Sequence, residues 1–96
     1  MRKCLKIQIT GSVQNTAYKA FIQKNAQSLG VEGTVQNLGT DSVVVHCCGP
    51  SVNLDQFIDL LYKGATTSHT GNLKELVTEP FVKEKDFRSV FRIIGD

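Results

Sequence analysis

The sequence from residue 31 to residue 48, VEGTVQNLGTDSVVVHCC, decides the fold. Its first part alternates between apolar or small residues at 31, 33 and 35 and polar residues at 32, 34 and 36. Residues 43–48 are β-branched or apolar apart from His46, as in a buried strand, and residues 37–42 contain several turn formers. Two strands joined by so short a turn pair as an antiparallel hairpin, so we predict a hairpin in the middle of the chain.

An alternating strand and an amphipathic helix are predicted before this hairpin. In the strand, every second residue is apolar, and these are Leu5, Ile7 and Ile9. The helix has apolar residues at i, i+3, i+4, i+8 and i+11, which form one stripe made of Tyr18, Phe21, Ile22, Ala26 and Leu29. Gly30 follows at the place where a helix end favours glycine.

A second helix and one or two strands are predicted after the hairpin. Ser51 is a suitable N-cap, and one face of the helix carries Leu54, Phe57, Ile58 and Leu61. We expect this helix to end at Gly64 and a small polar loop to follow over residues 65–71. Residues 73–77 resemble a fourth strand that Pro80 interrupts, and residues 90–94 are compatible with a further short strand.

The order β-α-β-β-α-β restricts the topology. Right-handed crossovers place both helices on one face of the sheet, and the third strand then lies between the first and the second. We therefore predict an α+β fold of the ferredoxin-like, split βαβ (βαββαβ) type, with an antiparallel sheet and two helices on one face. A doubly wound α/β sheet is disfavoured because the central hairpin is antiparallel. Residues 1–96 are expected to form a single domain.

Composition excludes several classes of protein. A hydrophobic share of 41% and a charged share of 21% are those of a globular chain and argue against disorder. The net charge of +2 is too small to indicate binding to nucleic acid or to an acidic membrane surface. There is no long apolar run of the kind that crosses a membrane. The amino-terminal residues lack the apolar core of a signal peptide, so we expect a cytoplasmic protein.

The three cysteines, Cys4, Cys47 and Cys48, form no Cys-x-x-Cys pair. Neighbouring residues of a strand point to opposite faces, so Cys47 and Cys48 are separated by the sheet. We expect buried free thiols, since cysteine packs as a small hydrophobic residue. A metal site that combines His46, Cys47, Cys48 and His69 is the alternative, but the ligand spacing of known sites is absent, so no metal is expected.

Residues 11–19, which read GSVQNTAYK, connect the first strand to the first helix. A short polar loop that opens a helix leaves backbone N–H groups unpaired at the positive end of the helix dipole. Such a loop binds phosphate-like anions well. Lys19 in the first turn adds a full positive charge. The stretch is therefore a candidate anion site.

The sequence resembles the acylphosphatase family in two blocks. The family's loop, Gly-x-Val-Gln-Gly-Val-x-Phe-Arg, is matched directly by Gly11, Val13 and Gln14. The family's second block, Gly-Trp-Val-Arg-Asn, falls on residues 33–37. The Gly-Pro pair at residues 49–50 and the glycine after the second helix also lie where the family has them, so the resemblance covers essentially the whole chain.

This resemblance implies an activity and a set of site residues. Acylphosphatases hydrolyse acyl phosphates to a carboxylate and inorganic phosphate without a metal or another cofactor. By resemblance, Lys19 occupies the position of the arginine that holds the phosphate, and Asn37 that of the asparagine that places the attacking water. The phosphate-binding loop then consists of Val13, Gln14, Asn15, Thr16, Ala17 and Tyr18. We expect a monomer that binds a small acyl phosphate or inorganic phosphate, and neither nucleic acid nor a membrane.

The main departure from the family is Lys19 in place of arginine. Arginine offers a planar fork that grips two phosphate oxygens, whereas lysine is a point charge. Misplacement of a bound group by about 1 Å costs roughly a hundredfold in rate, so weakened activity is expected. The alternative is a non-catalytic module that binds phosphate or another anion. Nucleic-acid binding is disfavoured because the strands lack an aromatic and basic motif of the RNP type.

Overall fold

The structure, a computed structural model, describes residues 2–11, 16–66, 73–80 and 90–94. They form five strands and two helices, which are β1 (Arg2–Gly11), α1 (Thr16–Ser28), β2 (Glu32–Leu38), β3 (Ser42–Pro50), α2 (Ser51–Thr66), β4 (Leu73–Pro80) and β5 (Phe91–Ile94). None of the described helices is long and apolar enough to cross a membrane.

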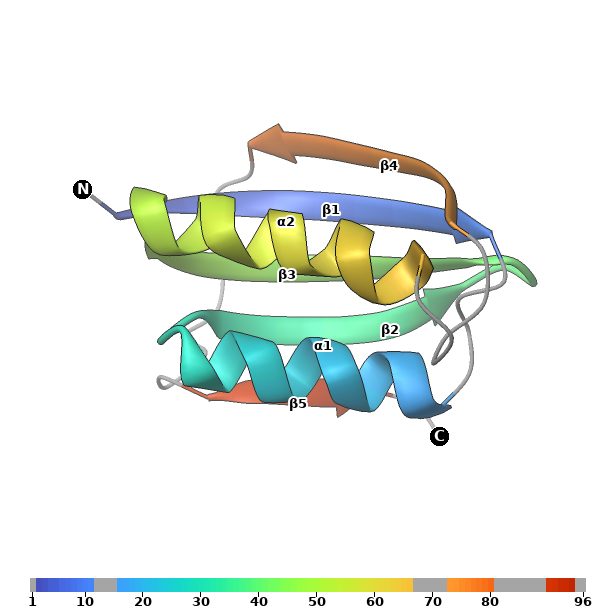
Figure 1. Ribbon diagram of the computed structural model, residues 1–96, viewed down its shortest axis with the longest axis horizontal. Coiled ribbons are helices and arrows are strands. Elements are labelled where there is room, and N and C mark those ends of the chain that lie inside the picture. Colours follow the sequence, from blue (N-terminus) through green and yellow to red (C-terminus); the bar gives the residue numbers. More distant parts are fainter. Residues whose placement is uncertain (1, 12–15, 67–72, 81–89, 95–96) are drawn as a thin grey trace.

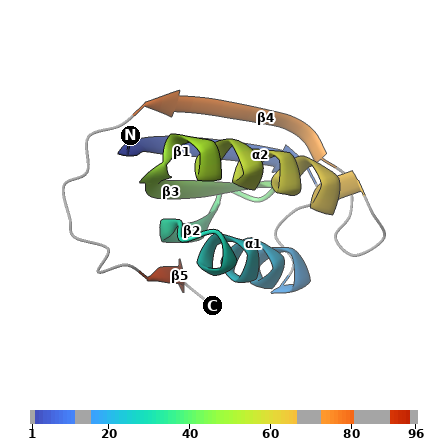
Figure 2. The same cartoon turned by 60° about the vertical axis from the view of Figure 1, so that its left-hand side comes forward.

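The strands make one sheet in the order β4-β1-β3-β2-β5, and both helices cover the same face of it (Figures 1 and 2). Strand β3 lies between β1 and β2 and is antiparallel to both. This arrangement confirms the predicted ferredoxin-like α+β fold. The sheet is mixed rather than purely antiparallel, because β5 pairs with β2 in the parallel direction at the edge of the sheet.

Three element boundaries differ from the predictions. Asn37 lies within β2 and not in the turn, because the β2–β3 ladder continues through the pairs Asn37–Val43 and Leu38–Ser42. Helix α2 continues past Gly64 to Thr66. Strand β4 extends through Pro80, which an edge strand tolerates because one side of its backbone has no neighbouring strand.

The hydrophobic core lies between the sheet and the two helices. Helix α1 contributes Tyr18, Ile22 and Ala26, and α2 contributes Leu54, Phe57 and Leu61, all with 0% exposure. The sheet contributes every second residue of its strands, among them Ile7, Ile9, Val35, Val43, Val45 and Phe91. The apolar stripes that predict the helices are thus the faces that the helices bury.

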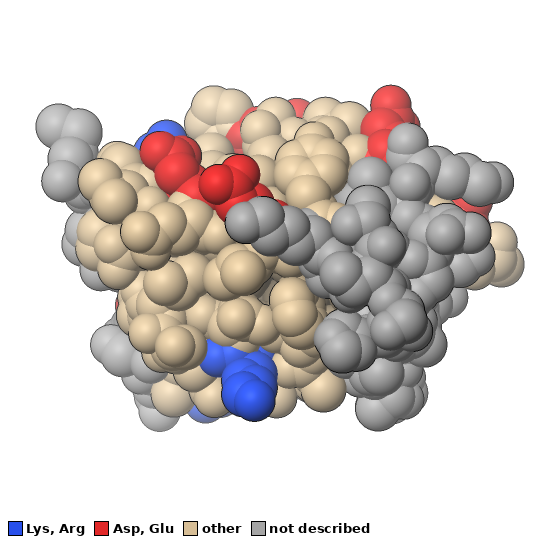
Figure 3. Space-filling view, in the orientation of Figure 1, with Lys and Arg blue, Asp and Glu red and all other residues tan. Residues whose placement is uncertain are grey.

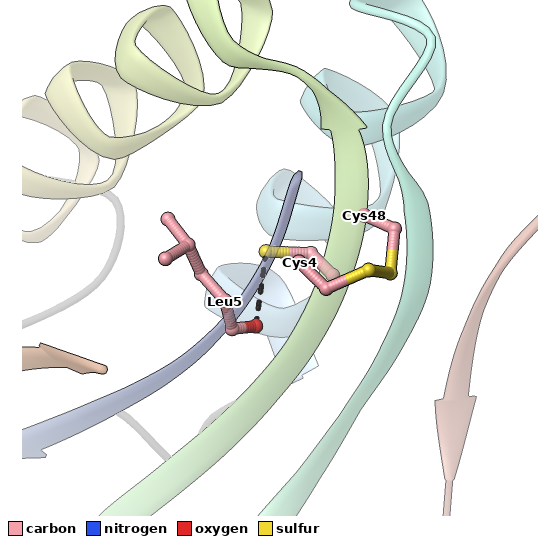
Figure 4. The surroundings of a disulfide bond; sticks show 4 residues. Cys4, Leu5 and Cys48 are labelled. Atoms are coloured by element: carbon pink, nitrogen blue, oxygen red, sulfur yellow. Dashed lines mark hydrogen bonds between the residues drawn. A yellow bond between two sulfur atoms is a disulfide. The ribbon is translucent and has the colours of Figure 1, made fainter. Parts of the chain in front are cut away.

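The prediction of three free thiols is wrong for two of the cysteines. Cys4 of β1 lies directly opposite Cys48 of β3, with 4.1 Å between their Cα atoms, and the two form a disulfide (Figure 4). The pairing depends on the register of two strands that are 44 residues apart, which their sequences do not specify. Cys47 is a buried free thiol, as predicted, and donates to the backbone oxygen of Leu5 at 3.5 Å.

Candidate active site

Three chain segments that are separate in the sequence meet at one end of the molecule. The carboxyl end of β1, the amino end of α1 and the β2–β3 hairpin lie together there (Figure 1). The amino end of a helix carries the positive end of its dipole, so α1 presents this positive end at the same end of the sheet.

The structure brings Lys19 and Asn37 into contact. Lys19 is the fourth residue of α1, and its side chain is only 1% exposed. Its Nζ donates a hydrogen bond to Asn37 Oδ1 at 3.3 Å. Asn37 is exposed near the end of β2. A buried cation thus lies beside a side-chain amide that solvent reaches, and this is a suitable geometry for attracting an anion and a water molecule to one place.

The chemistry of the two groups determines how the amide of Asn37 is turned. An ammonium group only donates hydrogen bonds, so the atom that faces Lys19 Nζ is the carbonyl oxygen of the amide and not its nitrogen. A carbonyl oxygen has two lone pairs. Asn37 Oδ1 therefore has the capacity to accept a second hydrogen bond from a water molecule while it accepts the one from Lys19.

A small hydrogen-bond network ties the end of β1 to the hairpin that carries Asn37. The backbone N–H of Gly11, the last residue before the loop, donates to the backbone oxygen of Asp41 at 2.8 Å. The hydroxyls of Thr10 and Ser42 are 3.0 Å apart, and Ser42 Oγ donates to Asp41 Oδ1 at 3.3 Å. Since an ionised carboxylate only accepts, Thr10 donates to Ser42, which in turn donates to Asp41. This network connects the carboxyl end of β1 to the β2–β3 hairpin, in which Asn37 also lies.

Removal of the Ser42 hydroxyl is expected to loosen this network. Ser42 is only 6% exposed, so Ser42→Ala leaves the polar groups of Thr10 and Asp41 without their shared partner. We expect the free energy of unfolding to fall by about 1–3 kcal/mol, measured by urea denaturation. Ser42→Thr retains the hydroxyl and is the matched control. Equal stability of the alanine and threonine variants would contradict a stabilising role for the network.

Tyr18 belongs to the core at this end of the molecule. Its side chain is 0% exposed, and its hydroxyl donates to the backbone oxygen of Leu61 at 3.1 Å. The sequence requires such a partner, since a buried tyrosine hydroxyl must be hydrogen-bonded. Burial raises the pKa of the phenol, which stays protonated. Tyr18 therefore joins the start of α1 to the end of α2, and its side chain points away from the predicted anion site.

The other predicted loop residues are described only in part. Thr16 and Ala17 form the first residues of α1, which agrees with the predicted opening of a helix. Val13, Gln14 and Asn15 lie outside the described residues. The phosphate-binding role assigned to these five residues and to Tyr18 remains a prediction.

His46 lies away from the Lys19–Asn37 pair. It belongs to β3, where its neighbours across the sheet are Lys6 and Thr34. Burial and, to a lesser extent, the charge of Lys6 lower the pKa of its imidazole. Within the described part of the chain, no group of three or more His, Cys, Asp or Glu side chains is placed to hold a metal ion. His69, the other histidine considered as a ligand, is outside the described residues.

The helix-covered face carries charges of both signs where it is described. Acidic atoms lie over α2, whose exposed carboxylates are Asp55 and Asp59, and basic atoms lie in separate small groups at the upper left and the lower edge of the view (Figure 3). A protein that binds nucleic acid through such a face presents a continuous basic surface. The described part of this face does not have that character.

Sequence analysis did not identify Thr10, Asp41 and Ser42 as site residues. A signal was present, because Asp41 and Ser42 follow Asn37 in the predicted hairpin and Thr10 precedes the loop. Their contact follows from the β1–β3 register, in which Thr10 is opposite Ser42. The sequence predicts that these strands are neighbours but not which residues face each other.

Comparison with known proteins finds matches in one family. The family model described as Acylphosphatase matches residues 5–89. An acylphosphatase of Vibrio parahaemolyticus is 33% identical over 92 residues, which are 96% of this chain and 97% of that protein. One of Thermotoga maritima is 35% identical over 78 residues, covering 81% of this chain and 87% of that protein. The crystal structure of the Bacillus subtilis acylphosphatase superposes with a TM-score of 0.83, covers 99% of this chain and 100% of that one, and at 20% identity shows a shared fold.

Proposed function

This chain belongs to the acylphosphatase family, and on that basis we propose that it hydrolyses an acyl phosphate to a carboxylate and inorganic phosphate at the Lys19–Asn37 site. The observation that carries this proposal is the hydrogen bond, 3.3 Å long, from the buried Lys19 Nζ to Oδ1 of the solvent-exposed Asn37. By the resemblance of the two sequence blocks, we take these positions as those of the family's phosphate-binding cation and water-positioning asparagine.

The two side chains meet the needs of this reaction. An acyl phosphate is an activated anhydride, so its hydrolysis depends more on charge stabilisation and on placement of water than on a strong base. Lys19, together with backbone N–H groups of the loop at residues 13–18, attracts and holds the phosphate. Asn37 Oδ1 accepts a hydrogen bond from the attacking water and keeps it aligned with phosphorus. No step of this scheme uses a metal or a cofactor.

The buried position of Lys19 favours this role. Its ammonium group interacts more strongly with an anion near a desolvated end of the sheet than a solvated lysine does in bulk water. Its contact with Asn37 limits the positions that the flexible side chain can occupy. Lysine lacks the planar fork of arginine, so we propose that this site turns over more slowly than one with arginine at the same position.

Neutralisation of Lys19 is expected to weaken phosphate binding. Lys19→Met keeps most of the apolar stem and removes a charge-assisted hydrogen bond worth about 1.5–3 kcal/mol, which corresponds to roughly 10- to 100-fold in affinity. The measurement is competitive inhibition of benzoyl phosphate hydrolysis by inorganic phosphate. Lys19→Arg is expected to raise phosphate affinity or kcat, because it restores the fork. If Lys19→Met retains the inhibition constant of the unsubstituted protein, Lys19 does not hold the phosphate.

A second function is a phosphate- or anion-binding module without turnover. The observation that favours it is the lysine at the position of the family's arginine. Titration with inorganic phosphate followed by NMR separates the two functions. Perturbed amides at the start of α1 without hydrolysis of benzoyl phosphate indicate a binding module, and the same perturbations with metal-independent hydrolysis indicate the enzyme.

The proposal includes an assembly state and a location. Lys19, Asn37 and the network around Ser42 all come from one copy of the chain, so we propose that a monomer suffices for activity. We also propose a cytoplasmic location. Thiols in the cytosol are kept reduced by glutathione and thioredoxin, so the state of Cys4 and Cys48 then depends on the thiol balance of the cell.

A further inference from the structure

The Cys4–Cys48 disulfide lies at the end of the sheet opposite to the candidate active site (Figures 1 and 4). Side chains alternate along a strand, and Ile7 and Ile9 of β1 point into the core below the helices. Cys4, three residues before Ile7, therefore points to the face of the sheet that the helices leave uncovered. Nothing in the proposed reaction uses this disulfide.

Among the described residues, the amino-terminal end of β1 pairs with one strand, β3. Its pairing with β4 begins at Leu5, which is opposite Pro80. Before Leu5, the only pairing of residues 2–4 with another described strand is with β3. A strand end with one partner has the fewest contacts and opens before the rest of the sheet. The disulfide connects this weakly held end to the central strand.

Cys47, the third cysteine, does not take part in thiol–disulfide exchange. Cys47 is next to Cys48 in the sequence, but its side chain belongs to the core on the other face of the sheet. Burial raises the pKa of its thiol to about 12. Thiol–disulfide exchange proceeds through the thiolate, so the Cys47 thiol is inert at neutral pH.

Backbone pairing between β1 and β3 places Cys4 opposite Cys48. Lys3 is paired with Gly49 on one side of them and Leu5 with Cys47 on the other. These backbone pairs can form without the bond between the sulfur atoms, so each time the reduced strand end closes, the two thiols come within reach of each other. A dithiol arranged in this way closes again when an oxidant is present.

We propose that Cys4 and Cys48 form a reversible redox latch, which pins the amino-terminal end of β1 to β3 when oxidised and lets residues 2–4 open when reduced. The chemistry requires a small disulfide such as glutathione disulfide. Cys4 is the more exposed of the pair, since Cys48 is 2% exposed, and its thiolate attacks one sulfur of glutathione disulfide and expels one glutathione thiolate. The Cys48 thiolate then attacks the Cys4 sulfur of the mixed disulfide and expels the second glutathione. The pair loses two electrons and two protons, and glutathione disulfide becomes two thiols.

The latch is separate from the site at the other end of β1. Residues 5–10 of β1, which pair with both β3 and β4, lie between the disulfide and the Lys19–Asn37 site. We therefore expect the latch to change how easily the end of β1 opens and how well the chain resists unfolding, but not to change turnover at Lys19 and Asn37. The inference does not depend on the proposed function.

Amide hydrogen exchange of the full chain, equilibrated with dithiothreitol or with glutathione disulfide, tests the latch. The Cα–Cα distance of 4.1 Å for Cys4 and Cys48 is that of a non-hydrogen-bonded pair, so the adjacent Lys3–Gly49 pair carries the ladder hydrogen bonds. We expect oxidation to remove two hydrogen atoms by intact mass and to slow exchange at Lys3 and Gly49 by about tenfold or more. Exchange at Gly11, which is bonded to Asp41 at the far end, changes by less than about threefold.

Two variants serve as controls. Cys4→Ser is expected to show the fast exchange at Lys3 and Gly49 under both conditions, while Cys47→Ala responds to oxidant as the unsubstituted chain does. The proposal is overturned if glutathione disulfide does not form the bond, if dithiothreitol does not reduce it, or if the bond maps to Cys47. Equal exchange at Lys3 and Gly49 in the two states also overturns it, as does a change in turnover above about threefold on reduction.

Discussion

Replacement of Asn37 by alanine is expected to lower kcat for benzoyl phosphate by about 10²–10³-fold, or roughly 3–4 kcal/mol of barrier. The change removes the carbonyl oxygen that accepts from Lys19 Nζ at 3.3 Å and that we propose aligns the attacking water. The lysine charge remains, so inhibition by inorganic phosphate is expected to change little. Steady-state kinetics with and without phosphate measure both effects.

The neighbouring residue Gln36 offers a matched control. It lies beside Asn37 on β2, and successive side chains of a strand point to opposite faces. Gln36→Ala is therefore expected to alter kcat by less than about threefold, as is usual for a change that does not touch the reacting groups. If Asn37→Ala is as active as Gln36→Ala, Asn37 does not place the water.

Asn37→Asp separates the position of the side chain from its charge. A carboxylate at this position forms an ion pair with the buried Lys19 ammonium and competes with phosphate for it. We expect this variant to lose both kcat and phosphate inhibition, in contrast to Asn37→Ala, which loses mainly kcat. Phosphate inhibition that is unchanged in Asn37→Asp would contradict a shared role for the two residues.

Gly33→Ala is expected to be the most destabilising single substitution in the β2–β3 ladder. Gly33 has a φ of +149°, which side chains rarely adopt, and a Cβ atom at this position would lie 1.9 Å from the backbone oxygen of His46. Because the obstacle is the backbone of the central strand, it has no rotamer by which to move away. We expect a loss of about 4 kcal/mol or more, or a fall in Tm of roughly 15–30 °C, measured by thermal denaturation.

Gly30 provides the comparison for this substitution. Its φ of +69° is also unfavourable for alanine, but nothing lies within 4 Å of the position of an added Cβ. Gly30→Ala thus measures the backbone cost alone, which is about 1–2 kcal/mol. A Gly33→Ala variant no less stable than Gly30→Ala would show that β2 and β3 move apart at low cost.

The order of elements could be predicted from the sequence because each element has a clear periodicity. The alternation around Ile7, the hairpin over residues 31–48 and the stripes around Ile22 and Phe57 are local patterns, and handedness rules convert their order into one topology. Element ends were less accurate, since Asn37 lies in a strand and α2 continues past Gly64. Ends depend on neighbouring strands and helices, which local patterns do not describe.

The candidate site was predictable as a set of residues but not as a geometry. Resemblance to the family indicates Lys19 and Asn37. The sequence around Lys19, however, does not show that this lysine is buried or that it contacts Asn37 of β2. The free-thiol prediction for Cys4 and Cys48 was wrong for a related reason. Both contacts join residues of different elements, and their distances depend on strand register and helix packing.

By itself, the sequence determined the elements, their order, the ferredoxin-like topology and the family of this protein. Periodicity and short motifs involve residues that are close together in the sequence, so they can be recognised without the structure. The tertiary structure alone decided that Lys19 meets Asn37, that Thr10 meets Ser42 and that Cys4 faces Cys48. Strand register and the docking of a helix on a sheet arise from the packing of the whole core. A register shift of one residue would turn the strand side chains among these to the opposite face of the sheet.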